Sequence, residues 1–175
     1  RHAFLKMQWQ NASLIMGQYW HPMFGPQVFP RSLSFGAALP LHPLNRSPQV
    51  RFAYKLSPGL EIIAAAIMHG YHDTKAYATD GEKAQANAAV PDMAAQLVLS
   101  PSTTMLLGFT AGYKVIKPRL ETDLGYKTET TVGNYNANVF AKINNSDFQM
   151  NMKAIYGQDL SHLVMIGGTG VKADR

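Results

Sequence analysis

The sequence has no cysteine among its 175 residues. Without thiols it has no disulfide framework, no thiolate metal site and no cysteine nucleophile. It also has no run of about 18 consecutive apolar residues, the length that predicts a transmembrane helix. These absences exclude a disulfide-stapled domain and a helical membrane span.

Charged residues are also scarce. They make up 15% of the chain, whereas about 25% is typical of a soluble domain. The 16 Lys and Arg residues are spread singly along the chain, and the net charge is +5. Nucleic-acid binders usually cluster their basic residues, so we expect no nucleic-acid partner. Few charges with many Gly, Asn, Thr and Gln residues suit a protein with a lipid-facing outside and a wet inside.

The clearest pattern in the sequence runs from Thr131 to Gly157. Apolar residues at every second position from Tyr135 to Ile143 alternate with mostly polar residues from Asn134 to Asn144. Asn145-Ser146-Asp147 then makes a turn, after which the alternation resumes. Because strand side chains alternate between two faces, this pattern predicts a hairpin with one apolar and one polar face.

Similar patterns predict six further strands, at 2–10, 13–20, 49–57, 60–71, 92–100 and 104–116. The connections alternate between short ones, at 10–12, 57–59, 101–103 and 145–147, and long ones, at 21–48, 72–91, 117–130 and after 157. Outer-membrane barrels have short periplasmic turns and long extracellular loops, and strands of about 9–11 residues cross the bilayer at a tilt. We therefore predict an all-β fold, an antiparallel up-and-down transmembrane β-barrel, as a single domain over residues 1–175.

The ends of the sequence favour a piece of a larger barrel. The chain starts at Arg1-His2-Ala3, inside a predicted strand, and has neither an initiator Met nor a signal peptide. About eight strands are present. The alternatives are a complete eight-stranded barrel with a structural or adhesion role, whose interior is filled by side chains, or a soluble β-sandwich binding module.

The predicted polar face carries cations and amides but Glu61 as its one acidic residue. Rings of Lys and Arg favour anions in a pore, because a wall of one charge sign concentrates counter-ions. The alternative is that these charges pair with acidic residues elsewhere or fill a sealed lumen. The predicted pore-lining residues are Lys6, Arg51, Lys55, Lys114, Asn134, Asn136, Asn138, Lys142, Asn151 and Lys153.

The long connection at 21–48 holds six of the ten prolines. Proline cannot donate to a strand ladder, so this segment is predicted to be irregular. Arg31 and Arg46 lie in it and are candidates for a constriction if the loop folds into the barrel. The alternative is an external loop held by proline and aromatic packing.

No catalytic site is predicted, and we expect the protein not to be an enzyme. Asp159, Ser161 and His162 are the ingredients of a catalytic triad, but they lie within four residues of one another. Triad partners usually converge from distant positions.

No metal site or cofactor is predicted either. His69 and His72 lie three apart at a strand end, which places them on opposite faces. His21 and His42, in the proline-rich loop, give no stronger signal.

Four motifs carry a family resemblance: 1–4 (RHAF), 17–22 (GQYWHP), 45–51 (NRSPQVR) and 117–120 (KPRL). With them the chain resembles the DcaP-like outer-membrane porins of Gram-negative bacteria, especially the Bacteroidota branch, over most of its length. The resemblance implies a larger porin barrel in the cell outer membrane, often trimeric, that passes small anionic solutes such as dicarboxylates. The chain has fewer strands than such a barrel, and it lacks the N-terminal segment and the closing C-terminal strand of the family.

Overall fold

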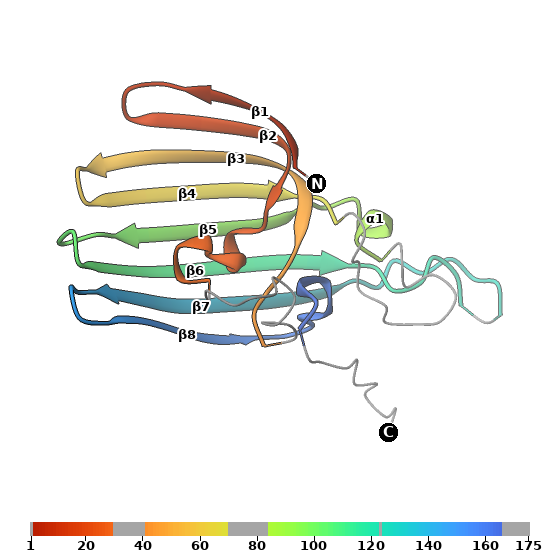
Figure 1. The fold of residues 1–175 in the computed structure, drawn as a ribbon. Coiled ribbons are helices and arrows are strands. Elements are labelled where there is room, and N and C mark those ends of the chain that lie inside the picture. The colour runs from red at the N-terminus through yellow and green to blue at the C-terminus, as the bar shows by residue number, and fades with distance from the viewer. Residues whose placement is uncertain (1, 30–40, 70–83, 123, 166–175) are drawn as a thin grey trace.

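The structure is a computed structural model and describes residues 2–29, 41–69, 84–122 and 124–165. Eight strands form one antiparallel sheet in which each strand lies beside its neighbours in sequence (Figure 1). The strands are β1 (Ala3–Gln8), β2 (Ala12–Trp20), β3 (Arg46–Ser57), β4 (Leu60–Ile67), β5 (Asp92–Leu99), β6 (Met105–Ile116), β7 (Val132–Asn144) and β8 (Gln149–Gly157). The predicted all-β, up-and-down arrangement is confirmed. In the described part of the chain β1 and β8 do not pair, so the sheet is open.

All the short turns lie at one end of the sheet and all the long connections at the other (Figure 1). In their described residues, the long connections contain four short helical turns, η1 (Pro22–Phe24), η2 (Pro26–Val28), α1 (Ala84–Ala88) and η5 (Ser161–Leu163). The helix α1 lies in a segment predicted to be loop. Among the described residues, no helix has the length and apolar character needed to cross a membrane.

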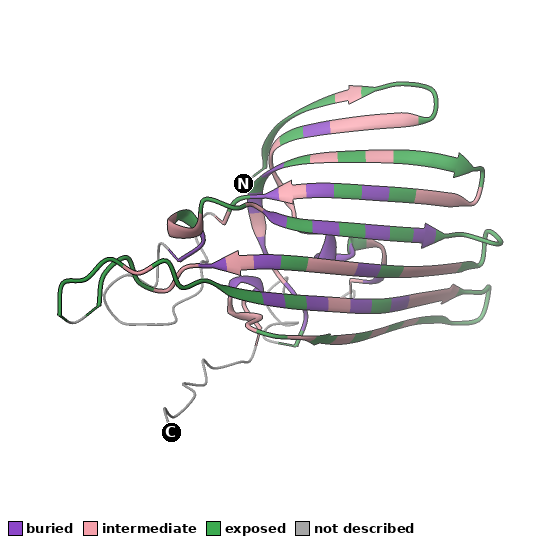
Figure 2. Cartoon of the chain, turned by 180° about the vertical axis from the view of Figure 1, so that it is seen from behind, coloured by how far each residue is buried: buried purple, intermediate pink, exposed green. Residues whose placement is uncertain are grey.

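The two faces of the sheet differ in chemistry, as the alternation predicted. In β5, Met93, Leu97 and Leu99 are exposed, whereas the interleaved Gln96 and Val98 are buried. Figure 2 shows the same banding of buried and exposed residues across the strands. We call the side with Met93 and Leu97 the apolar face and the side with Gln96 the polar face. The apolar face is exposed, and the polar face is covered from β4 to β7, where Ile63, Gln96, Thr110 and Asn138 are buried.

The chain itself covers the polar face. A first inward segment, residues 21–29 and 41–45, and a second one, residues 158–165, cross the polar face (Figure 1). Gln96 Nε2 donates to the carbonyl of Pro22 at 2.9 Å, and Asn138 Nδ2 donates to that of Met23 at 3.0 Å. The described residues of the proline-rich loop therefore fold against the polar face, one of the two arrangements that the sequence left open.

Apolar contacts also hold the first inward segment. Val28 packs with Val98 and Phe140 in a buried cluster. Gly25, between η1 and η2, has a φ of 53°, a left-handed conformation that favours glycine. At Gly108 a Cβ would come within 2.0 Å of the Phe140 ring, so the missing side chain makes room for this ring. The first inward segment is thus held by a small hydrophobic cluster together with the hydrogen bonds from Gln96 and Asn138.

Candidate functional site

The six Lys and Arg residues among the predicted pore-lining residues lie on one side of the sheet. The strand register places Lys6 and Arg51 in one row through Ile15, and it pairs Lys55 with Glu61. The other three are Lys114, paired with Asn134, Lys142, paired with Asn151, and Lys153, paired with Phe140. Because directly paired residues project to the same face, all six side chains share the polar face. Their pore-lining role stays a prediction.

The predicted pore-lining residues differ in access to solvent. Lys6 and Lys55 are exposed, and Arg51, Lys142 and Asn151 are partly buried. Asn134, Asn136, Asn138 and Lys114 are buried, with exposed fractions of 7%, 4%, 2% and 0%. These four contact the protein itself and do not line open space.

The ammonium of Lys153 is held by the first inward segment. Its Nζ donates to the carbonyls of Met23 at 3.0 Å and Phe24 at 2.7 Å. It also lies 3.2 Å from His42 Nε2. Burial and the nearby Lys153 cation lower the pKa of His42 from 6.5 to about 4. Lys153 therefore anchors the segment through its backbone.

The two constriction candidates have different outcomes. Arg31 lies outside the described residues. Arg46 is the first residue of β3 and is not in a loop, so its placement in the proline-rich loop was wrong. Its guanidinium lies over the Trp20 ring, 4.8 Å from the ring centroid. This cation–π contact and the pairing with β2 extend the strand back to Arg46.

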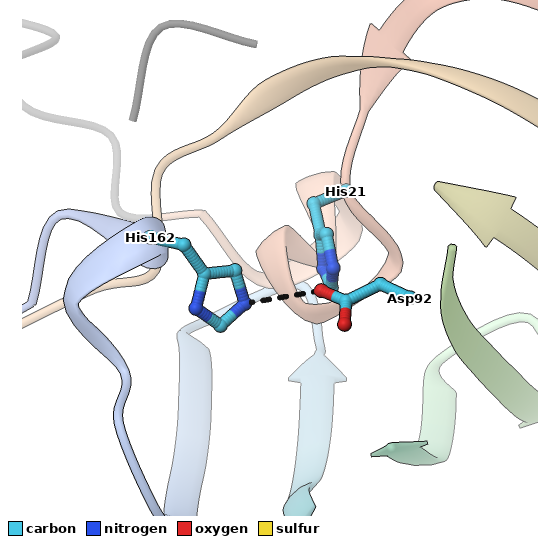
Figure 3. A group of neighbouring side chains, drawn as sticks. All are labelled: His21, Asp92 and His162. Carbon is cyan, nitrogen blue, oxygen red and sulfur yellow. Dashed lines mark ion pairs between the residues drawn. The ribbon is translucent and has the colours of Figure 1, made fainter. Parts of the chain in front are cut away.

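A cluster of buried metal-binding residue types lies at the long-loop end of the polar face (Figure 3). It contains His21 from the first inward segment, Asp92 from the start of β5 and His162 from η5. One ligand atom from each residue lies within 4.8 Å of the other two. The distance from His162 Nε2 to Asp92 Oδ2 is 3.6 Å.

Three further residues surround this cluster. His69 Nε2 lies 2.6 Å from Asp92 Oδ2, and the His69 ring stacks on that of His162 with 4.6 Å between centroids. Lys114 Nζ donates to His162 Nδ1 at 2.9 Å and pairs with Asp159 Oδ2 at 2.9 Å. The buried ammonium therefore has a carboxylate partner, as a buried charge requires.

The environment keeps the cluster histidines neutral. Burial lowers the pKa of His21 to about 3, and His69, Lys114 and Arg51 add electrostatic opposition to a further positive charge. Burial likewise holds the pKa of His162 well below its ordinary value, with Lys114 as the next cause. Neutral imidazoles are the form in which histidine binds metals.

The three residues weighed as a Ser–His–Asp triad lie close together in and before η5. Ser161 Oγ donates to Asp159 Oδ1 at 2.5 Å. The His162 ring is occupied by Lys114 and the Asp159 carbonyl, at 2.9 and 3.2 Å from Nδ1. Of the other metal candidates, His72 lies outside the described residues.

Sequence reasoning missed the grouping of His21, Asp92 and His162. The signal was present in the connections, because each of these residues borders a long connection. In an up-and-down sheet all such residues lie at the same end. Spacing along the chain does not show this, since the three residues come from β2, β5 and β8 and the segments next to them.

The chain matches no protein-family model, no curated protein and no solved structure. The resemblance to DcaP-like porins therefore rests on the sequence motifs alone.

Proposed function

We propose that this chain forms part of the wall of an outer-membrane β-barrel that lets small hydrophilic solutes, preferentially anions, diffuse passively. The observation that carries the proposal is the uncovered apolar face. Large apolar side chains on this face are exposed in all eight strands: Leu5, Met16, Val50, Phe52, Tyr54, Ile62, Met93, Leu97, Leu99, Met105, Phe109, Tyr113, Tyr135, Val139, Met150, Met152 and Tyr156.

These side chains form rows that run from strand to strand. One row reads Tyr54, Ile62, Leu97, Phe109, Val139 and Ala154 through five consecutive strand pairings. Soluble monomers rarely expose contiguous apolar patches larger than a few hundred Å². In a membrane barrel the lipid-facing side is an apolar band and the interior is polar. Contact of the apolar face with lipid would account both for the exposure of its large apolar side chains and for the polar character of the opposite face.

The polar face supports the anion preference. Lys6 and Lys55 are exposed, and Arg51 and Lys142 are partly exposed. Two acidic residues in the strands lie on this face: Glu61, which the register places beside Lys55, and the buried Asp92 at the start of β5, which the sequence analysis left out. A mainly cationic wall of low dielectric attracts anions. The first inward segment reaches the middle of the polar face, where it binds Gln96 and Asn138, so it narrows the passage there.

The second candidate is a barrel with a structural or adhesion role, and one observation favours it. The polar face is filled from β4 to β7, where Ile63, Gln96, Thr110 and Asn138 are all buried. Small barrels fill their interior with side chains and do not conduct. The two candidates share the lipid contact and differ in whether water crosses.

The experiment that separates them is conductance of the full-length protein in a planar bilayer under a salt gradient. We expect single-channel currents and a reversal potential of the sign for anion selectivity. Replacing Lys6, Arg51, Lys55 and Lys142 together with Gln should shift that potential toward the cation side, because it removes cations from the wall.

The control is Lys127→Gln, since Lys127 is exposed in the connection between β6 and β7, and its removal lowers the net charge by one, as each of the four wall substitutions does. The control should leave the reversal potential unchanged. Cation selectivity of the unaltered protein would contradict the assigned wall. Absence of conductance from a folded, inserted protein would favour the structural barrel.

A further inference from the structure

We propose that His21, Asp92 and His162 form a binding site for one first-row divalent metal ion, of which Zn²⁺ is the representative. The proposal does not depend on the channel function. It rests on the donor set, on the burial of all three residues and on polar atoms that lack partners.

The donor set is two imidazole nitrogens and a carboxylate. Imidazole suits Zn²⁺ and its neighbours, and carboxylate joins it in many three-ligand sites. The separation of 3.6 Å between His162 Nε2 and Asp92 Oδ2 is close to the edge of a tetrahedron with metal–ligand bonds of about 2.1 Å. The widest separation, 4.8 Å, must contract by roughly 1 Å on binding.

Unpartnered atoms point to a missing ligand. Asp92 Oδ1 and His162 Nε2 are buried and make no hydrogen bond in the structure. The side chains of these residues are 4% and 0% exposed. Buried polar atoms are nearly always paired, and an unpaired one calls for a water or an ion. In Figure 3 the unpaired nitrogen of His162 points toward the carboxylate of Asp92.

Ligation through Nε2 requires the ring proton on Nδ1. For His162 the carbonyl of Asp159, 3.2 Å from Nδ1, is the acceptor for that proton. Lys114 then loses its hydrogen bond to His162 Nδ1. Its contacts with Asp159 remain, a hydrogen bond of 2.6 Å to the carbonyl and an ion pair of 2.9 Å with the carboxylate. For His21 the bond from the Met23 N–H to Nδ1, 3.2 Å long, is given up. Metal binding therefore exchanges these two hydrogen bonds, of 2.9 and 3.2 Å, for two coordinate bonds.

His69 is the positioning residue of the site. Its Nε2 is 2.6 Å from Asp92 Oδ2, the oxygen that also faces His162 Nε2 at 3.6 Å, so it orients the carboxylate toward the site. Partners of this kind typically change metal affinity by about 10–100-fold when removed. The ion would join both inward segments to the start of β5, because each of the three supplies one ligand.

The test is Zn²⁺ binding to the full-length protein, purified in detergent without a histidine tag and stripped with a chelator. We expect one equivalent of Zn²⁺ per chain, and Co²⁺ in its place should give the visible absorption of a four-coordinate site. His162→Gln and Asp92→Asn should each abolish the Co²⁺ band. His69→Gln should keep the stoichiometry and weaken the affinity by about 10–100-fold.

The control is His42→Gln. His42 is also buried in the first inward segment, but it contacts Phe24 and Lys153 and not the cluster. This variant should bind Zn²⁺ like the unaltered protein. Asp92→Asn keeps the size of the side chain, so circular dichroism of this variant separates loss of metal from loss of fold. No stoichiometric Zn²⁺ in the unaltered protein, or equal binding by the folded Asp92→Asn variant, would overturn the proposal.

Discussion

Lys114 and Lys153 lie on the same face of the sheet, and the inward segments hold both. Lys114 Nζ is bound to Asp159 and His162, whereas Lys153 Nζ is bound to two backbone carbonyls. A lysine on the polar face is thus not always open to solvent. In the proposed channel, the wall cations that a solute can meet are the exposed Lys6 and Lys55 and the partly buried Arg51 and Lys142.

We expect Lys153→Met to loosen the first inward segment. The substitution removes the ammonium bonds to the Met23 and Phe24 carbonyls, at 3.0 and 2.7 Å. Hydrogen bonds to a charged group contribute about 1.5–3 kcal/mol each, and Met keeps most of the packing volume. Chymotrypsin should therefore cleave after Phe24 faster than in the unaltered protein.

Lys142→Met is the matched control for this prediction. Lys142 is also a partly buried lysine on the polar face, in β7. It should leave cleavage after Phe24 unchanged. Equal cleavage rates in all three proteins would mean that the ammonium of Lys153 does not hold the segment.

At the scale of the element, the first inward segment is held by contacts that respond to pH. The pKa of His42 is about 4 in the packed segment and 6.5 in an unpacked chain. Below pH 6.5, His42 binds a proton when the segment is unpacked, whereas in the packed segment it stays neutral down to about pH 4. The contribution of neutral His42 to the stability of the packed segment is therefore complete above pH 6.5 and is lost as the pH falls from 6.5 toward 4.

Trp20 reports this change. Its ring stacks on Phe24 of η1, with centroids 4.1 Å apart and an angle of 18° between the rings. In a Trp9→Phe background, Trp20 fluorescence should change as the pH falls from 6.5 to 4. His42→Gln should reduce the fluorescence change. The change that remains is assigned to protonation of His21, whose pKa is also lowered, to about 3. An identical titration in both proteins would exclude His42 as a cause.

The strands were more predictable than the segments that cover them. The sequence pattern predicted all eight strands, and in β7 the predicted faces agree with the burial pattern from Asn134 to Phe140. The start of β3 was missed because Pro48 suggested a loop, although strand pairing with β2 continues back to Arg46. Two features depend on tertiary contacts: the helix α1, and the grouping of His21 with Asp92 and His162. Such contacts leave no periodic pattern in the sequence, so the alternation could not predict them.

For the whole molecule, the decisive property is what the apolar face meets. Val139 lies in the middle of β7 and is 52% exposed on that face. If the face meets lipid, Val139→Arg should destabilise the protein folded in lipid vesicles by about 2–4 kcal/mol. Denaturant titration of the vesicle-inserted protein measures this. Gln149→Arg, at an exposed polar-face position near a short turn, should cost far less.

A near-neutral effect of Val139→Arg would mean that the apolar face meets water. The lipid contact, and with it both proposed barrel functions, would then fail. A large effect from Gln149→Arg as well would indicate a general intolerance of arginine and not a lipid-facing position.

For the proposed outer-membrane barrel, the connections predict an orientation in the membrane, and the prediction can be tested because the chain has no cysteine. Short turns of outer-membrane barrels face the periplasm and long connections face outward. Ser102 lies in the turn between β5 and β6, and Tyr126 is 71% exposed in the long connection between β6 and β7. In intact cells a membrane-impermeant maleimide should label Tyr126→Cys and should label Ser102→Cys only after permeabilisation. The reverse pattern would invert the orientation, and equal labelling of both sites in intact cells would contradict a membrane-spanning sheet.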